Sequence, residues 1–324
     1  MRRVGKPLQV AVAVAATTIA VTACSSQGGA KNEGNATGKN YTIAMVTHEA
    51  PGDTFWDKIR NGAQAAAKNH NVTLKYSNDP DSGKQATLIQ NAIDSKVAGI
   101  ATTLPDPPAI GPAAQAALKA GIPVVAFNAG KDQYQKYGIS MYFGSDEDLA
   151  GQTVGKKIVQ TTPSSHTICV IQEQGQVQLE GRCAGVKKTD PNSQVLYVNG
   201  RDLPAVQQTI GAKLQQDKTI TDVVTLGGDI ALAAQKATKD AGSKAKIATF
   251  DLNAEVAQQI QTGGIAFSVD QQPYVQGYMA VTSLWLNLTN GNDIGGGGPV
   301  LTGPSIVDQS NIAKIIPYTK QNTR

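Results

Sequence analysis

The sequence predicts an α/β fold of two lobes, each a doubly wound parallel sheet with helices on both faces. Short β-branched runs alternate with amphipathic runs from residue 41 onward, which is typical of strand–helix units. The strand runs are mostly continuous and apolar, as expected when both faces of a sheet are covered. The chain has 324 residues, and a single core stops growing at about 250–300 residues, so two lobes are expected.

The expected strands are more numerous than one small lobe needs. They lie at 41–47, 72–77, 98–103, 122–127, 166–171, 194–198, 222–226, 246–250 and 265–269. Between two of them, Pro107 opens a helix that Gly121 ends. Large apolar residues at helical spacing indicate a core-facing stripe on a late helix. They are Tyr274, Tyr278, Val281, Trp285 and Leu288.

Three segments are expected to carry the chain from one lobe to the other. The first lies at Gly144-Ser145-Asp146, where a crossing strand leads into a helix. The second follows Gln271, and the third lies near 301–303, after the Gly-rich loop 295–298. We therefore expect one lobe from residues 41–144 plus 272–301, and the other from residues 145–271 plus 302–324.

The first 23 residues are typical of a secretion signal and are not expected to join the fold. An apolar run at 10–21 is too short to span about 30 Å of hydrocarbon comfortably as a helix. Val21-Thr22-Ala23-Cys24 resembles a bacterial lipobox, in which the Cys is lipidated after cleavage. An ordinary signal with a chance Cys is the alternative. Residues 24–40 lack apolar periodicity, so we expect a flexible tether there.

The charge balance and the missing motifs exclude several classes of function. The formal net charge is +4 from 29 basic residues, of which Arg2, Arg3 and Lys6 belong to the signal. Without these three the chain has 26 basic and 25 acidic residues and is nearly neutral. We therefore expect no nucleic-acid partner. No glycine-rich dinucleotide loop follows the first strand, and no Walker loop or nucleophile elbow occurs. With three His and no zinc-like Cys spacing, we expect no metal, cofactor or catalytic residue.

Polar and aromatic side chains follow the expected strands, at the carboxyl ends where ligands bind in open α/β sheets. The candidate ligand-binding residues are His48, Phe55, Trp56, Asn128, Arg182, Asp229, Asp251 and Gln271. Aromatic faces stack on the CH groups of a sugar, while carboxylates, amides and a guanidinium bind its hydroxyls. The sequence therefore predicts a site for a neutral polyhydroxylated ligand.

Each candidate also has a structural alternative. Trp56 could pack in the core of its lobe, and Arg182 could be a solvated helix residue. Asp229 and Asp251 could cap the helices that follow them. His48 stays undecided between a ligand contact and a structural place.

The stretch 41–320 resembles substrate-binding proteins of the ribose-binding type, which deliver sugars to ABC importers. The matching stretches, in chain order, are 41–46, Asp53-Thr54-Phe55-Trp56, 121–128, Gly144-Ser145-Asp146, 181–185 with Arg182, Thr249-Phe250-Asp251 and Asp270-Gln271-Gln272-Pro273. The resemblance implies the type I periplasmic-binding-protein fold, with two lobes that close on a sugar by hinge motion.

Carried over position by position, the resemblance implies stacking by Phe55 and Trp56. It also implies hydroxyl contacts from Arg182, Asp251 and Gln271. Two positions depart from the pattern, because Asn128-Ala129 replaces an Asp-Arg pair and Gly228 replaces an amide. These departures argue against a plain ribopyranose and leave another pentose, a furanose sugar, a hexose, a polyol or inositol open.

We therefore expect a monomeric receptor, lipid-anchored to the outer face of the bacterial cytoplasmic membrane, that presents a simple sugar or polyol to a permease. One alternative is a receptor for a small furanosyl signalling molecule. Another is a secreted glycoside-processing enzyme that uses Asp229 and Asp251. A sugar-responsive repressor shares this core but needs an N-terminal DNA-binding motif, where this chain has a signal and a tether.

The other two cysteines, Cys169 and Cys183, are candidates for a disulfide because an exported protein permits one. With Cys169 on a strand and Cys183 on the next helix, rises of about 3.3 and 1.5 Å per residue offset them by about 8 Å. That offset is beyond easy bridging. An irregular segment at 172–180 could remove it, so the pairing stays open.

Overall fold

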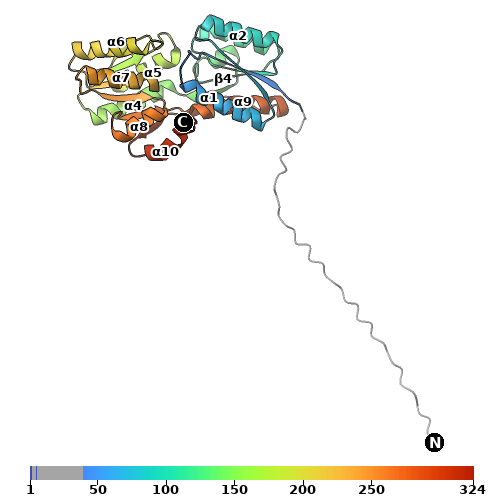
Figure 1. The fold of residues 1–324 in the computed structure, drawn as a ribbon. Helices are drawn as coiled ribbons and strands as arrows, with labels where there is room; N and C mark the ends of the chain where they lie inside the picture. The colour runs from blue at the N-terminus through green and yellow to red at the C-terminus, as the bar shows by residue number, and fades with distance from the viewer. Residues whose placement is uncertain (2–4, 6–38) are drawn as a thin grey trace. The chain divides into compact units, whose positions relative to one another are not determined.

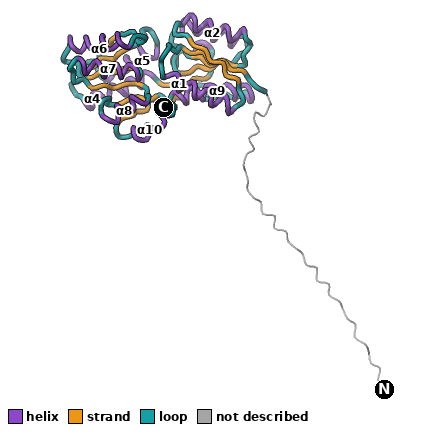
Figure 2. Tube along the Cα trace, viewed as in Figure 1, coloured by secondary structure: helices purple, strands orange, loops and turns teal. Residues whose placement is uncertain are grey.

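The structure is a computed structural model that describes Met1, Gly5 and residues 39–324. Cys24, nearly all of the expected signal and most of the expected tether lie outside the described residues. The described part contains two six-stranded sheets, each with helices on both faces (Figure 1, Figure 2). This arrangement confirms the predicted fold class. No helix within residues 39–324 is both long and apolar enough to cross a membrane.

The first lobe is built on a parallel sheet with the strand order β11–β5–β4–β3–β1–β2. These strands are β1 (Thr42–Thr47), β2 (Thr73–Asn78), β3 (Gly99–Thr102), β4 (Val124–Phe127), β5 (Met141–Ser145) and β11 (Val300–Gly303). Ile43 and Met45 of β1 pack with α1 (Phe55–Asn69) and α9 (Pro273–Asn290). Ala44 and Val46 pack with α2 (Ser82–Asp94) and α3 (Pro107–Lys119) on the other face. Successive side chains of β1 therefore point to opposite faces of the sheet and contribute to two separate core layers. A 3₁₀ turn, η1 (Tyr134–Tyr137), follows β4.

The second lobe repeats this strand order as β12–β10–β9–β8–β6–β7, with only β12 antiparallel to its neighbour. Its strands are β6 (Thr167–Ile171), β7 (Gln194–Tyr197), β8 (Asp222–Thr225), β9 (Lys246–Phe250), β10 (Phe267–Asp270) and β12 (Ser305–Asp308). Two helices, α4 (Glu147–Thr161) and α5 (Val177–Thr189), cover one face. The other face packs against α6 (Leu203–Gln216), α7 (Gly228–Asp240), α8 (Ala254–Thr262) and α10 (Ile312–Lys320).

The chain passes between the lobes at three places, as the fold class requires. These are the passages from β5 to α4, from β10 to α9, and from β11 through Pro304 to β12. The strand β11 continues to Gly303, two residues past the expected limit at 301, because Gly303 pairs with Ser145. Ser145 itself ends β5 and lies one residue past the expected limit at 144. The other lobe limits stay a prediction.

The face of α9 that enters the core overlaps the predicted stripe, since Val281 is buried and Tyr278, Trp285 and Leu288 pack against the core, but it is shifted toward smaller residues. Val281 is buried as expected, but Ala280 and Leu284 are its buried neighbours, and the four other predicted residues are only partly buried. The reason is a close approach of α1 to α9. A Cβ on Gly62 would lie 2.0 Å from the carbonyl oxygen of Tyr274, so the two helices meet through small residues. Trp285 is partly buried at the margin of the first-lobe core, where it stacks on His70 with ring centroids 4.3 Å apart.

Candidate functional site

A cavity of about 250 Å³ lies between the two lobes, at the carboxyl ends of the central strands. Both lobes contribute to its walls. All eight candidate residues from the sequence line it, namely His48, Phe55, Trp56, Asn128, Arg182, Asp229, Asp251 and Gln271. The fold therefore brings together side chains that are up to 223 positions apart in the sequence, although their roles toward a ligand stay a prediction.

The segment between β1 and α1 supplies the aromatic wall. Trp56 is 3% exposed and belongs to the core of the first lobe, yet it also lines the cavity. Phe55 and His48 meet its ring edge-on, with centroids 5.3 and 4.7 Å away. The two alternatives for Trp56, core or cavity, are therefore both realised by one side chain.

His48 is buried and held on both ring nitrogens. Its Nδ1 lies 2.7 Å from Thr103 Oγ1, and its Nε2 lies 3.1 Å from Gln178 Nε2 on the other lobe. Because an amide nitrogen donates, His48 Nε2 accepts, and the ring proton lies on Nδ1 and points to Thr103. Burial, and to a smaller extent the Arg182 charge, lowers the pKa of His48 to about 3. His48 is thus a neutral side chain at ordinary pH.

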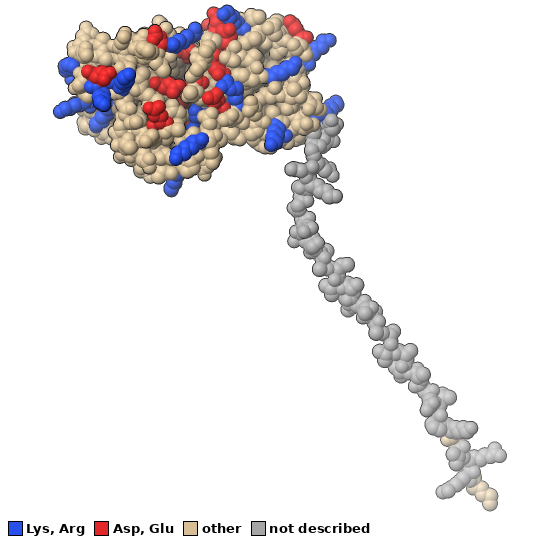
Figure 3. All heavy atoms as spheres, in the orientation of Figure 1, with Lys and Arg blue, Asp and Glu red and all other residues tan. Residues whose placement is uncertain are grey.

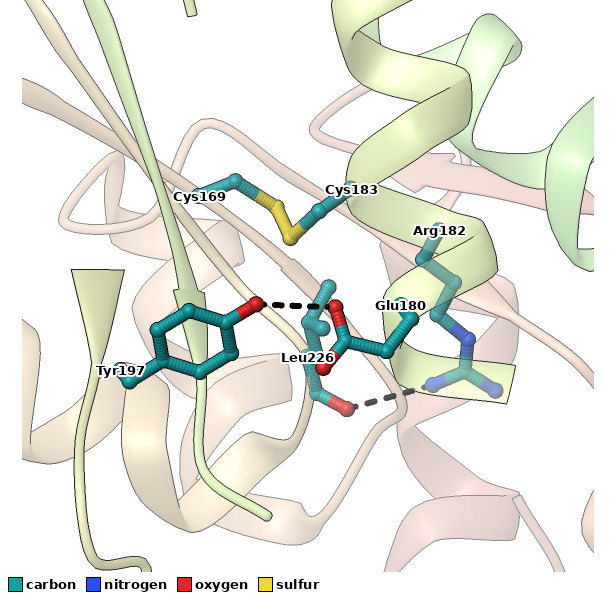
Figure 4. Close-up of a disulfide and its surroundings, with 6 residues drawn as sticks. All are labelled: Cys169, Glu180, Arg182, Cys183, Tyr197 and Leu226. Atoms are coloured by element: carbon teal, nitrogen blue, oxygen red, sulfur yellow. Dashed lines mark hydrogen bonds between the residues drawn. A yellow bond between two sulfur atoms is a disulfide. The ribbon is translucent and has the colours of Figure 1, made fainter. Parts of the chain in front are cut away.

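Arg182 is 2% exposed and forms an ion pair with Glu147 from the first turn of α4. Its Nε and Nη2 donate to the two carboxylate oxygens at 2.6 and 3.2 Å. Nη1 donates to the carbonyl oxygen of Leu226 at 3.3 Å (Figure 4), and the guanidinium lies 4.6 Å from the ring centroid of Phe250. The interpretation of Arg182 as a solvated helix residue is therefore wrong, because the side chain points into the lobe.

A network of amides links the two lobes beneath the cavity. Asn128 Nδ2 donates to Gln271 Oε1 at 3.3 Å, and Gln271 Nε2 donates to Asp251 Oδ1 at 2.8 Å. Gln276 is fully buried and contacts both Asn128 and Gln271. Asn128 and Asp251 occupy equivalent places, one after β4 and one after β9, and share the left-handed backbone with φ of 64° and 66°.

Carboxyl groups from both lobes line the cavity. Burial raises the pKa of Asp251 to about 6, although Arg182 opposes this rise. Burial also raises the pKa of Asp53 to about 7, and the charges of Asp229 and Asp251 add to the rise. On the face drawn in Figure 3, Asp and Glu side chains surround the hollow between the lobes. The cavity is therefore a poor place for a phosphate or a carboxylate.

The cap interpretations of the two aspartates are wrong. The residue that caps α8 is Asn253, whose side chain accepts from the Val256 amide at 2.8 Å. Asp229 lies inside the first turn of α7, after the N-cap Gly227. It accepts from Asn253 Nδ2 at 3.1 Å and, across the lobes, from Thr54 Oγ1 at 3.3 Å.

Some acceptors at the cavity have no partner within the described part of the chain. These are Gln172 Oε1 and Gln178 Oε1, both buried atoms on side chains that line the cavity. A buried acceptor without a donor is costly. A ligand with several hydroxyl groups supplies donors for such atoms, and its CH faces suit the aromatic wall.

The sequence profile of the periplasmic binding protein domain matches residues 43–293. The chain belongs to the periplasmic binding protein family. The family consists of extracytoplasmic substrate-binding proteins of ABC importers. The chain is accordingly a substrate-binding protein and not an enzyme, which removes the glycoside-processing alternative.

Two solved structures are similar to this periplasmic binding protein. A carbohydrate transporter from Acidothermus cellulolyticus 11B, solved in complex with myo-inositol, is 57% identical. That match covers 88% of this chain and 100% of the other, with a TM-score of 0.87. A solute-binding protein from Burkholderia graminis C4D1M in complex with D-arabinose is 22% identical with a TM-score of 0.76. The match covers 85% of this chain and 97% of that one, and it shows the fold alone.

A characterised relative is the xylose/arabinose-binding protein XylF of Sulfolobus acidocaldarius. It is 24% identical over 267 residues, which is 76% of this chain. The match spans 66% of that relative, just under two thirds of its length.

The periplasmic binding protein carries a disulfide between Cys169 of β6 and Cys183 of α5 (Figure 4). Their Cα atoms are 5.8 Å apart. The estimated offset of about 8 Å is wrong because residues 172–176 are not helical and let α5 fold back beside β6. The bridge ties the helix that carries Arg182 to β6, which lies between β8 and the edge strand β7 of its lobe.

Sequence reasoning missed three buried polar groups around the cavity, Glu147, Gln178 and Gln276, and the partly buried Asp53. Asp53 belongs to the turn after β1, so its place after a strand could have identified it. Glu147 and Gln178 lie in first helical turns, where acidic and amide side chains are usually solvated. Gln276 carries no sequence signal, since only the approach of the crossing segment buries it.

Proposed function

We propose that this chain is the ligand receptor of an ABC importer and that its ligand is an uncharged cyclic polyol of the inositol type. The observation that carries the proposal is the cavity itself, in which carboxyl groups, amides and a paired guanidinium face an aromatic wall. The complex of the 57% identical protein with myo-inositol supports this class of ligand. The proposal takes the chain as a monomer, since both walls of the cavity come from one chain.

In this proposal each cavity residue has a defined task. Phe55 and Trp56 stack on the CH face of the ring, as aromatic rings do on apolar faces. Asp251 and Gln271 accept and donate hydrogen bonds to neighbouring hydroxyls, and Arg182 donates with the N–H groups that Glu147 and Leu226 leave unused. A ligand held by both lobes then favours the closed arrangement.

Isothermal titration calorimetry tests the proposal. Myo-inositol is expected to bind at least about tenfold more tightly than D-xylose, L-arabinose or D-glucose, and inositol phosphate is expected to bind least. Asp251→Asn is expected to weaken myo-inositol binding by about 10- to 100-fold, because a charged acceptor is lost. The matched control is Asp202→Asn, the same change at the N-cap of α6. A folded protein that binds a pentose best, or binds no polyol, would contradict the proposal.

We further propose that Cys24 carries a lipid that holds the receptor on the outer face of the cytoplasmic membrane. The motif Val21-Thr22-Ala23-Cys24 and the non-periodic stretch after it support this. In cells fed a labelled fatty acid, the wild-type protein is expected to carry the label and Cys24→Ala is not. The unlabelled variant is expected to be released into the culture medium. Label that survives in Cys24→Ala would rule out this attachment site.

A further inference from the structure

The first turn of α5 makes direct hydrogen bonds to the other lobe. The amide of Val177 donates to the carbonyl oxygen of Pro105 at 3.0 Å. Helix α5 has no side-chain cap of its own, and first-turn amides have no partner within a helix. One of these otherwise unpaired groups is therefore satisfied by the opposite lobe.

The next residue of α5 makes a second bond across the lobes. Gln178 Nε2 lies 3.1 Å from His48 Nε2, and it also donates to Gln176 Oε1 at 2.5 Å. The oxygen of Gln176 fixes which way the Gln178 amide faces, since two oxygens would repel at that distance. Gln178 is 5% and His48 4% exposed, so this bond is shielded from water.

The first-lobe side of the contact is also held in place. Thr103 Oγ1 lies 2.7 Å from His48 Nδ1 and accepts from Gln85 Nε2 at 3.1 Å. The rings of Trp56 and His48 meet edge-on, with centroids 4.7 Å apart, and this contact fixes the plane of the imidazole. His48 thus presents a fixed acceptor toward Gln178.

Helix α5 is fastened to the second lobe, so a contact at its first turn acts on the lobe as a whole. The disulfide joins Cys183 to β6, and Arg182 pairs with Glu147 of α4. The helices α4 and α5 also approach closely, since a Cβ on Gly185 would lie 2.3 Å from the carbonyl oxygen of Asp148. These contacts hold α5, including its first turn, against the rest of the second lobe.

We propose that the first turn of α5 is a latch between the lobes, in which Gln178 donates to His48 and the amide of Val177 donates to Pro105, and that this latch slows ligand release. Gln178 is a positioning residue in this role. The nature of the released ligand rests on the proposed function, whereas the latch between the lobes does not.

The first test is the dissociation rate of myo-inositol measured by stopped-flow fluorescence. Gln178→Leu keeps most of the side-chain volume and removes the amide. The dissociation rate constant is expected to rise about five- to tenfold, as for one lost buried hydrogen bond, while association changes little. The matched control is Gln215→Leu on the exposed face of α6, which is expected to behave as the wild type.

The second test needs no ligand. Hydrogen exchange of the peptide spanning Val177 is expected to be faster in Gln178→Leu than in the wild type and in Gln215→Leu, because the amide of Val177 loses its partner when the lobes part. If the wild type binds no polyol, the proposed function fails. The latch is then tested by hydrogen exchange alone, since that measurement needs no ligand. Unchanged exchange in Gln178→Leu, in a protein with unchanged thermal unfolding, overturns the latch.

A pH profile separates a positioning role from a merely structural one. In the wild type His48 faces Arg182 from α5, Trp56 from α1 and Thr103, and it stays neutral. Gln178→Glu adds a carboxylate that raises the pKa of His48, so the two side chains form an ion pair at low pH. Asp251 and Asp53 also titrate in this pH range, in the variant and in the wild type alike, so the quantity compared is the ratio of the two release rates. Release from Gln178→Glu relative to the wild type is expected to slow as the pH falls from about 8 to 5. A ratio that does not change with pH counts against the latch.

Discussion

Replacing Arg182 by Met is expected to abolish polyol binding and to lower the free energy of unfolding by about 3–5 kcal/mol. Glu147, which is 8% exposed, would lose its ion-pair partner inside the second lobe. The carbonyl oxygen of Leu226 would also lose a donor. Urea unfolding followed by circular dichroism measures the stability, and calorimetric titration with myo-inositol measures the binding.

The double variant Glu147→Leu/Arg182→Met separates the two effects. Removing both members of a buried ion pair is often neutral for stability, so most of the lost free energy is expected to return. Binding is expected to stay absent, because the donors toward the cavity are still missing. A single variant as stable as the wild type would show that the pair is not buried as described, and binding by the double variant would remove Arg182 from the site.

Loss of the Cys169–Cys183 disulfide is expected to lower the free energy of unfolding by about 3 kcal/mol, the usual value for a loop of about 15 residues. The two cysteines are 14 positions apart. The double variant Cys169→Ala/Cys183→Ala is also expected to bind polyol more weakly, because α5 carries both Arg182 and the latch turn. Thermal unfolding and calorimetric titration measure the two effects.

Two controls accompany this experiment. Wild type treated with a reductant is expected to resemble the double variant, once a thiol assay shows that the bridge is open. Cys24→Ala is expected to unfold as the wild type does. Identical unfolding of the double variant and the wild type would show that the bridge adds nothing to stability.

The fold could be predicted well because the strands are nearly all apolar and the breaks between elements are clear. Each expected strand occurs, with ends shifted by one or two residues in most cases. The short strands β11 and β12 were not expected as strands, because they form only by pairing with the distant strands β5 and β10. Pairing of this kind has no local pattern.

The cavity could be predicted as a set of residues but not as a set of contacts. Position after a strand identified Asp251 and Gln271, since the topology brings those ends together. The partners of Arg182 and His48 come from helices of other segments, so no spacing in the sequence points to Glu147 or Gln178. The stripe on α9 was predicted in part, because Val281 is buried and Tyr278, Trp285 and Leu288 pack against the core. The close approach at Gly62 of another helix, which no local pattern shows, was not predicted.

The matching strand orders of the two lobes have a consequence for how a nearly symmetric ligand is oriented in the cavity. Asn128 and Asp251 stand at matching places in the two lobes, and their side chains have almost the same shape. One is a neutral amide and the other an acid whose pKa lies near 6. A six-membered ring with a hydroxyl on every carbon presents hydroxyl groups of nearly the same chemistry all around its rim, which differ mainly in being axial or equatorial. Because the two side chains differ in charge, they would favour one orientation of such a ring in the cavity.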